Sequence, residues 1–374
     1  KRIMAVVPTL PTSEIFLRSP YWLFVEIANL DYVLCDLRIW TGELTAEPAT
    51  TSAKLRSTAL NGKTSIDIAE FARDYVEVTF AGTVDSNAVF ISYELTHYLQ
   101  GATVEPTPET RVYLTGLDGY STFHDGVNYQ WFKQTMLSDS NVSVYNDTSI
   151  KVPVMQKFLI GYRLQRLQGG LWHTFRQENS LVPATNTSGL IKNITSSYQN
   201  YYADRLLLLF SQGQDEAVYF NYTPCTKHGV TRLFFVNRLG CIQEMHFGGS
   251  FGAEVSVESD EYKRNILVDG SYNSTRHQNT TINKNGKIKL TLNTDWRLET
   301  ENDSIIEMMM SEQIWIQVDA ERIGRGWAPK TSSILTIPVN LVSDTSKIKN
   351  RLNDKLINYT FSFEAASDWI NTVR

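Results

Sequence analysis

Residues 287–293 read KIKLTLN, and polar and apolar side chains alternate along them. The same alternation returns in IWIQV at 314–318, LTIPVNL at 335–341 and INYTFSF at 357–363. A period of two residues is typical of a β-strand that buries one face. Four such strands predict an antiparallel sheet or sandwich over residues 287–363, a module without a catalytic signature.

One short helix is predicted between the first and the second of these strands. Ser304 and Glu307 have the spacing of a capping box, in which both side chains bind free N–H groups at the start of a helix. The apolar residues at 305–306 and 308–310 then provide about two to three turns.

Length and composition favour several β-rich domains. The chain has 374 residues, of which 42% are hydrophobic, 20% charged and 11% aromatic. Since a domain holds roughly 100–200 residues, we expect two or three of them. We predict a mainly β, multi-domain protein with antiparallel β-sandwich-like modules and a few short helices. The assigned domains are 1–150 (N-terminal, β-sandwich-like), 151–250 (middle, β, with a polar loop near 179–200) and 251–374 (C-terminal β module with the short helix near 304–311).

Local patterns predict further elements outside the C-terminal module. Strands are expected at 21–27 and 33–40, and an amphipathic helix at 66–76. The dipeptide Asn61-Gly62 is a strong signal for a hairpin turn. Residues 255–283 are polar, and we expect few strands there.

Charge and hydropathy disfavour some classes of function. The net charge is −5 without a block of basic residues, which argues against specific nucleic-acid binding. A mildly acidic surface remains compatible with a channel through which DNA slides. No run reaches the ~18 apolar residues of a membrane helix, and residues 1–8 are too short for a signal peptide. The three cysteines, an odd number, favour reduced thiols and synthesis in a cytoplasm.

Two cysteines and two histidines lie close together in the sequence. Cys225, His228, Cys241 and His246 have the side chains of a tetrahedral zinc site. Neither half has the usual Cys-x-x-Cys spacing, however, and small buried cysteines with histidines at turns explain the same residues. We favour the second interpretation and expect no metal and no cofactor.

Candidate catalytic groups are weak. The pair His124-Asp125 has the residue types of acid–base catalysis, but Asp125 precedes Gly126 and is explained as a turn former. Acidic residues at 215–216 and 258–261 include the carboxylates that a glycosidase needs, although a solvated loop explains them as well. We expect no catalytic residues and no enzyme.

Aromatic side chains crowd into predicted loops and segment ends. Such residues serve either as core anchors or as contacts in subunit interfaces, where Tyr and Trp are enriched. We expect part of the Met-rich helix, or the flanking loop at 322–327, to touch another subunit, because methionine packs adaptably. The interface candidates are Trp131, Tyr201, Tyr202, Met308, Met309, Met310, Trp327 and Trp369.

Short patches over most of the chain share the pattern of one family. The first are SPY at 19–21, LRIW at 37–40, IDIAEFARDY at 66–75, LDGY at 117–120 and DGVN at 125–128. Later come FVNRLG at 235–240, DW at 295–296, MMSE at 309–312 and NYTFSFE at 358–364. Together they resemble virion structural proteins of tailed bacteriophages, including crAss-like and related marine phages. Such proteins often have Gly or a hydrophobic residue where this chain has Cys241, which further disfavours zinc.

The resemblance implies a β-rich component of the neck, tail or baseplate, present as a ring of several copies. Its expected partners are copies of itself and other virion proteins (portal, tail or baseplate components), with DNA nearby but not specifically bound, and no membrane. We expect it in the virion after synthesis in the host cytoplasm. The alternatives are a receptor- or glycan-binding tail adhesin that stacks Trp131 and Trp327 on sugars, and a glycan-cleaving tail enzyme.

Overall fold

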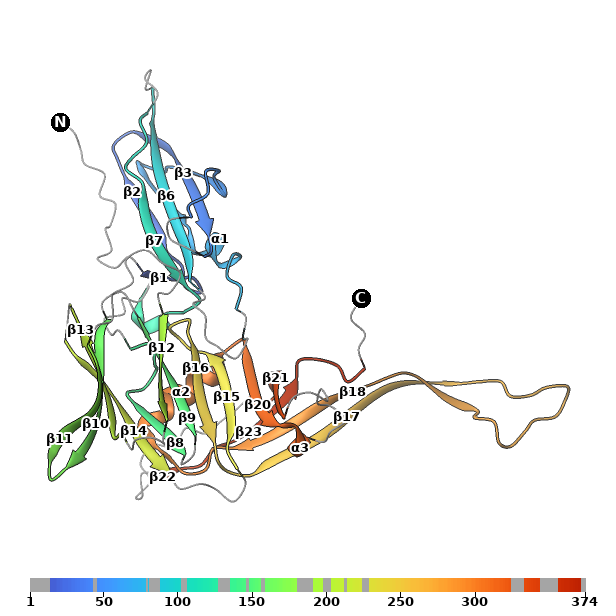
Figure 1. Ribbon diagram of the computed structural model, residues 1–374. Coiled ribbons are helices and arrows are strands. Elements are labelled where there is room, and N and C mark those ends of the chain that lie inside the picture. Colours follow the sequence, from blue (N-terminus) through green and yellow to red (C-terminus); the bar gives the residue numbers. More distant parts are fainter. Residues whose placement is uncertain are drawn as a thin grey trace. The chain divides into compact units, whose positions relative to one another are not determined.

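The computed structural model describes residues 14–42, 46–78, 80, 88–101, 106–126, 135–145, 148–155, 159–179, 191–197, 203–211, 214–223, 229–323, 333–343 and 356–370. The chain forms two compact units. Unit 1 comprises Lys1–Asn221, Phe235–Glu244 and Asp303–Ser311, and unit 2 comprises Tyr222–Phe234, Met245–Asn302 and Glu312–Arg374. Antiparallel strands dominate the ribbon and helices are short, so the mainly β class is confirmed (Figure 1). The three-part division near residues 150 and 250 stays a prediction.

The N-terminal part of unit 1 contains a five-stranded sheet in the order β1-β7-β6-β3-β4 and a two-stranded sheet of β2 and β5. Alternate residues of β3, such as Val33 and Leu37, are fully buried and share one apolar core with Leu23 and Val25 of β2. The residues between them on β3 face the other way. The elements are β1 (Glu14–Phe16), β2 (Trp22–Glu26), β3 (Leu30–Trp40), β4 (Ala53–Thr58), β5 (Lys63–Asp67), α1 (Ala69–Arg73), β6 (Val89–Leu99), β7 (Val112–Leu117) and the 3₁₀ turn η1 (Phe123–Asp125).

Two local predictions in this part are confirmed, one with a shorter extent. Asn61 and Gly62 both have positive φ, and Leu60 and Lys63 exchange backbone hydrogen bonds across them, as a primed hairpin turn requires. The predicted helix at 66–76 is limited to α1, because the residues before it pair with β2 as part of β5.

The remainder of unit 1 holds a five-stranded sheet in the order β11-β10-β13-β14-β8, a two-stranded sheet of β9 and β12, and helix α2. The polar loop predicted near 179–200 is wrong for residues 191–197, which form β12 and pair with β9. Only a few apolar residues mark this strand, among them the buried Ile194. The elements are β8 (Asn141–Tyr145), β9 (Ser149–Met155), β10 (Leu159–Gln168), β11 (Leu171–Glu178), β12 (Ile191–Ser197), β13 (Arg205–Phe210), β14 (Glu216–Thr223) and α2 (Asn302–Met310).

A seven-stranded sheet in the order β16-β15-β20-β21-β23-β18-β17 dominates unit 2. The first three strands predicted from alternation and residues 360–363 of the fourth belong to it, so the prediction is confirmed for them, whereas Ile357 lies in β22, which pairs with β19 in a separate two-stranded sheet. The last run is interrupted, because residues 358–359 separate β22 from β23. The elements are β15 (Thr231–Val236), β16 (Ile242–Phe247), β17 (Phe251–Lys263), β18 (Asn279–Asn293), β19 (Arg297–Leu298), the 3₁₀ turn η3 (Glu299–Glu301), β20 (Ile314–Asp319), α3 (Ala320–Ile323), β21 (Ile334–Leu341), β22 (Leu356–Ile357) and β23 (Thr360–Ala365).

The prediction that residues 255–283 contain few strands is wrong. They hold most of β17 and the start of β18, which form a long antiparallel hairpin (Figure 1). Nearly all of their side chains are exposed, so no buried face imposes the alternation that marks other strands. Among the described residues, no helix is both long enough and apolar enough to span a membrane.

The predicted helix exists as α2, but the predicted capping box is wrong. The helix begins at Asn302, two residues before Ser304. The backbone N–H of Ser304 donates to Asp139 Oδ2 at 2.9 Å, and its hydroxyl donates to the same oxygen at 2.6 Å. A carboxylate distant in sequence therefore binds the free N–H group that the local box was expected to satisfy.

Candidate functional site

The three methionines proposed as interface residues differ in exposure. Met308 is fully buried within its own chain, Met309 is half-buried and Met310 is 59% exposed. Of these three methionines, Met310 therefore offers the most surface for a subunit contact, and Ile306 of the same helix is 36% exposed.

Of the aromatic interface candidates, Trp369 is described and is 45% exposed. It lies beside the long hairpin, where its backbone N–H donates to the carbonyl oxygen of Gly286 at 2.7 Å. The others lie outside the described residues: Trp131, Tyr201, Tyr202 and Trp327.

The cysteines and histidines considered for zinc are described in part. Cys225 and His228 lie outside the described residues, whereas Cys241 and His246 are buried. Burial raises the pKa of the Cys241 thiol far above its ordinary value. In the described part of the chain, no group of three or more His, Cys, Asp or Glu side chains has a geometry that could hold a metal ion.

Asp125, considered for acid–base chemistry, is engaged by its own chain. It accepts hydrogen bonds from the backbone N–H of Thr122 at 2.7 Å and from its hydroxyl at 2.6 Å, and it pairs with Arg238. Partial burial alone would raise the pKa of this carboxyl, but the bonds from Thr122 and the charge of Arg238 lower it. The carboxylate thus closes η1, in agreement with its interpretation as a turn former.

Two of the patches that carry the family resemblance lie against each other in unit 1. The N–H of Tyr120 donates to the carbonyl oxygen of Arg238 at 2.8 Å. A Cβ at Gly119 would lie 2.6 Å from that oxygen, and a Cβ at Gly240 would lie 2.6 Å from the backbone nitrogen of Asp118. Backbones this close require glycine at both positions. We call residues 118–120 and 237–240 the turn junction.

Asn237 organises the turn junction from within. Its side chain is fully buried, and Oδ1 accepts from the N–H groups of Leu239 at 3.1 Å and Cys241 at 3.0 Å. Its Nδ2 donates to the carbonyl of Met136 at 2.8 Å and to Gln243 Oε1 at 3.0 Å. Both donor hydrogens are used, as a buried amide requires.

Helix α2 joins the same network through Glu307. Its carboxylate accepts from Ser138 Oγ at 2.5 Å and from the backbone N–H of Arg238 at 2.9 Å. Burial raises the pKa of Glu307 above its ordinary value, although these two bonds act in the opposite direction. The hydroxyl of Ser311, in the patch at 309–312, accepts from Val236 N at 3.2 Å. Three resemblance patches therefore meet in one polar cluster.

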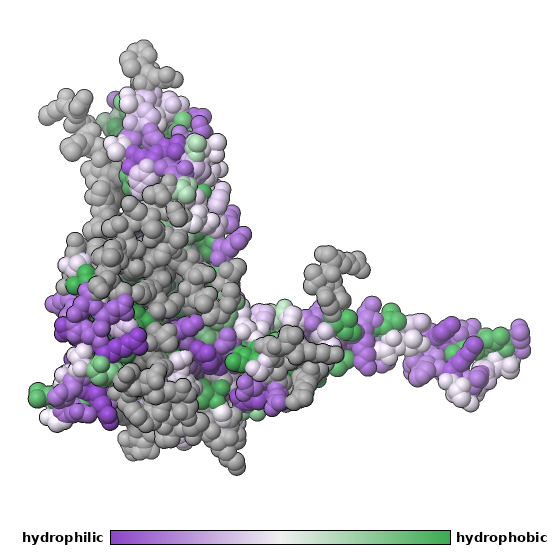
Figure 2. Space-filling view, in the orientation of Figure 1, coloured by the Kyte–Doolittle hydropathy of each residue, from purple (hydrophilic) through white to green (hydrophobic). Residues whose placement is uncertain are grey.

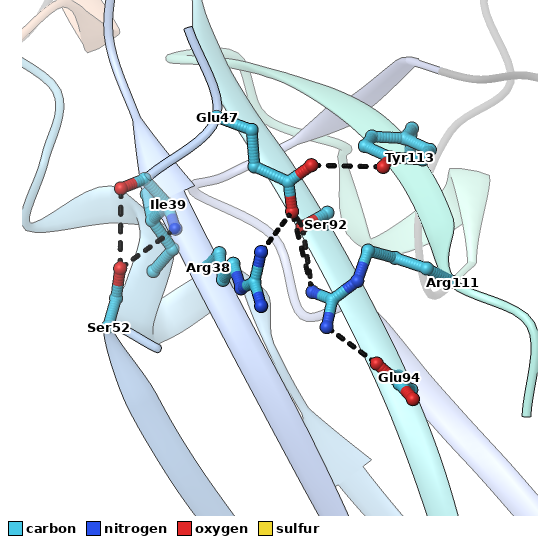
Figure 3. Close-up of polar contacts among 8 residues, drawn as sticks. All are labelled: Arg38, Ile39, Glu47, Ser52, Ser92, Glu94, Arg111 and Tyr113. Atoms are coloured by element: carbon cyan, nitrogen blue, oxygen red, sulfur yellow. Dashed lines mark hydrogen bonds and ion pairs between the residues drawn. The ribbon is translucent and has the colours of Figure 1, made fainter. Parts of the chain in front are cut away.

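A second polar cluster covers the outer face of the N-terminal sheet (Figure 3). Arg38 on β3 and Tyr113 on β7 flank Ser92 on β6 in register. Glu47 lies across this row, where it accepts from Ser92 Oγ at 2.7 Å and Tyr113 Oη at 2.9 Å and pairs with Arg38 at 3.1 Å. Arg111 lies 3.5 Å from the same carboxylate.

The contacts of Glu47 indicate that it holds a loop in place rather than acting in acid–base chemistry. Slight burial alone would raise the pKa of Glu47, but hydrogen bonds from Ser92 and Tyr113, with the charges of Arg111 and Arg38, lower it. A carboxylate held ionised in this way pins the segment after residue 45 onto the sheet.

The long hairpin is the main exposed feature of unit 2. We call residues 254–289 the arm: the outer parts of β17 and β18 with the tip at 264–278. The arm extends away from the other strands of its sheet, and hydrophobic residues recur along its surface (Figures 1 and 2). Its large exposed hydrophobic side chains are Val255, Val257, Tyr262, Leu267, Val268, Tyr272 and Ile282.

The tip of the arm is an ordered turn. Val268 and Ser271 exchange backbone hydrogen bonds across Asp269 and Gly270, which have φ of 51° and 79°. These values define a primed two-residue turn. The dipeptide Asp269-Gly270 after the apolar run at 266–268 is a sequence signal for this turn. The surrounding polar residues nevertheless favour a region with few strands, which the structure contradicts.

Comparisons with known proteins add little to this geometry. No protein-family model and no curated protein matches the chain. Among solved structures, the chain is similar to the crystal structure of CBD12 from CALX1.2, with 9% sequence identity, a TM-score of 0.17, and coverage of 54% of this chain and 77% of that chain. A match at this level carries no argument about function.

Proposed function

We propose that this chain is a structural component of a tailed-phage virion, present as several copies in a neck, tail or baseplate ring. The arm is the observation that carries the proposal. Val255 and Val257 are more than half exposed on the same strand, and Leu267 and Tyr272 are exposed at the tip. Exposed apolar surface of this kind is typical of protein–protein contacts.

The turn junction supports a mechanical role. A protein that holds neighbours in a particle needs segments that keep their relative positions. Asn237 and Glu307 bind backbone groups from segments far apart in sequence, and glycines allow the backbones to touch. Buried polar networks whose members are satisfied make a structure rigid and specific.

The sequence resemblance to phage virion proteins also supports the proposal. Three of its patches, at 117–120, 235–240 and 309–312, contribute to the polar cluster around the turn junction. The patch at 235–240 contacts both of the others, through Arg238 to Tyr120 and through Val236 to Ser311.

The proposal is tested by locating the chain in purified particles. Cryo-electron microscopy combined with quantitative mass spectrometry should find more than two copies arranged about the tail axis. Absence from purified particles would overturn the proposal. Binding of the isolated protein to host-cell glycans, with no place in a ring, would favour the adhesin instead.

A further inference from the structure

Charges on the arm are segregated between its two strands. Residues 251–262, on β17, contain four acidic residues and no basic one. Residues 263–289, which include the tip and most of β18, contain six basic residues and one acidic residue. The acidic residues are Glu254, Glu258, Asp260 and Glu261, and the basic ones are Lys263, Arg264, Arg276, Lys284, Lys287 and Lys289.

The acidic strand lies at an edge of its sheet. β17 ends the strand order and pairs only with β18 among the described strands. Val255 pairs in register with Ile288, yet Ile288 is 1% exposed and Val255 is 55% exposed. An open edge with exposed apolar side chains recruits a further strand, and a two-stranded ribbon alone is only marginally stable.

We infer that the acidic edge strand of one copy binds the basic tip and return strand of the arm of a second copy. Charge complementarity selects this partner, since the chain carries both halves of the contact. Two β17 edges facing each other would place like charges opposite one another, which is destabilising. The contact is therefore head to tail, and such a contact closes into a ring when its rotation allows.

The charges that the contact requires are available on the surface. Glu258 and Glu261 are exposed, and their register partners on β18 are the uncharged Asn285 and Thr281. Arg264 and Arg276 are exposed at the tip. None of these four charged side chains makes an ion pair within the described residues, although the pKa of Lys287 is raised mainly by Glu364 and to a lesser degree by the charge of Glu258. Their replacement should therefore leave the isolated fold intact.

This inference rests on the proposed function, because a virion ring supplies the second copy, and it names the surface involved. The test uses two charge-reversal variants of the full chain. The edge variant combines Glu258→Lys with Glu261→Lys, and the tip variant combines Arg264→Glu with Arg276→Glu. A matched control for the edge variant, Glu70→Lys with Glu77→Lys, makes the same charge change at exposed positions of unit 1.

Self-association of each protein is measured by light scattering and sedimentation at low salt. Wild type and control should form discrete oligomers, and each arm variant alone should associate about tenfold or more weakly. An equimolar mixture of the two arm variants should recover the oligomers, because each reversed surface then meets its complement. Circular dichroism and thermal unfolding verify that each variant is folded.

Three results would overturn the inference: a wild type that stays monomeric, arm variants that associate like the wild type, or a mixture that does not recover. Capture of the arm only by another virion protein would likewise remove the second copy as the partner. The proposed function is judged separately, by the position of the chain in the particle. A ring whose copies meet through other surfaces would therefore contradict the arm contact but remain consistent with the virion role.

Discussion

The turn junction requires glycine at position 240. Its φ is +78°, a conformation that costs a residue with a side chain roughly 1–2 kcal/mol. A Cβ there would also lie 2.6 Å from the backbone nitrogen of Asp118. We predict that Gly240→Ala lowers the free energy of unfolding by about 2–4 kcal/mol, measured by urea denaturation.

Gly270, in the arm turn, is the matched control for this substitution. Its φ is +79°, but an added Cβ would meet nothing within 4 Å. Gly270→Ala therefore carries the conformational cost without the clash and should lose only about 1 kcal/mol. Equal losses at Gly240 and Gly270 would show that the close approach of the backbones is unimportant.

Glu307 gives the fold a defined pH dependence. Its pKa lies above its ordinary value of about 4.5 because it is buried, so the folded chain binds the proton more tightly than the unfolded chain. The contribution of Glu307 to stability is therefore greatest at low pH, and it falls as the pH rises from about 4.5 through the raised pKa.

Glu307→Gln should remove this fall, because the amide is neutral at every pH and keeps an acceptor for Ser138 and Arg238. Urea denaturation of both proteins between about pH 4.5 and 7 should show the variant gaining stability relative to wild type as the pH rises. Parallel curves for the two proteins would contradict the assignment.

At the scale of the element, α2 depends on a cap supplied from elsewhere in unit 1. Asp139 accepts both the N–H and the hydroxyl of Ser304. Loss of a capping oxygen costs about 0.5–2 kcal/mol, so we predict a loss in this range for Asp139→Ala. Asp139→Asn keeps an acceptor and should lose less. Chemical denaturation of the two variants tests the ordering, and an equal loss would argue against capping.

The sequence predicts those strands that bury one face and expose the other to solvent. Strands β18, β20 and β21 alternate because buried residues such as Ile288, Ile316 and Ile337 are separated by half-buried or exposed ones. The strands of the arm are not predicted, because both of their faces are exposed and polar residues are tolerated on either face. Alternation in the sequence marks a strand that buries one face, and it gives no signal for a strand that buries neither face.

The polar cluster at the turn junction was predictable only in its parts. The patches at 117–120 and 235–240 are short motifs in the sequence, and no sequence pattern predicts that they meet. Their meeting depends on Asn237, Gln243 and Glu307, whose partners lie more than a hundred residues away in several cases. Spacing rules describe neighbours in sequence, so they assigned Glu307 to a local capping box that does not form.

At the scale of the whole molecule, the chain passes repeatedly between its two compact units. Residues 235–244 and 303–311 belong to unit 1, although they follow segments that belong to unit 2. No contiguous fragment that ends at residue 221 therefore contains all of unit 1. The missing segments carry buried groups of the core, including Leu239 and Cys241, which pack with Phe16 and Met136.

We predict that a fragment of residues 1–221 leaves β9 unprotected against amide exchange, because β9 packs against the missing segments through Met155 and Lys151 N donates to Glu244. Without Asn237, Gln243 and Glu307, the carbonyl of Met136 and the hydroxyl of Ser138 lose their buried partners, at about 1–3 kcal/mol for each unsatisfied group. Hydrogen-exchange mass spectrometry should find β9 protected in the full chain and exposed in the fragment. Adding residues 222–374 as a second fragment should restore protection, because it supplies both missing segments. Equal protection in the fragment alone would show that unit 1 folds without the segments that return to it.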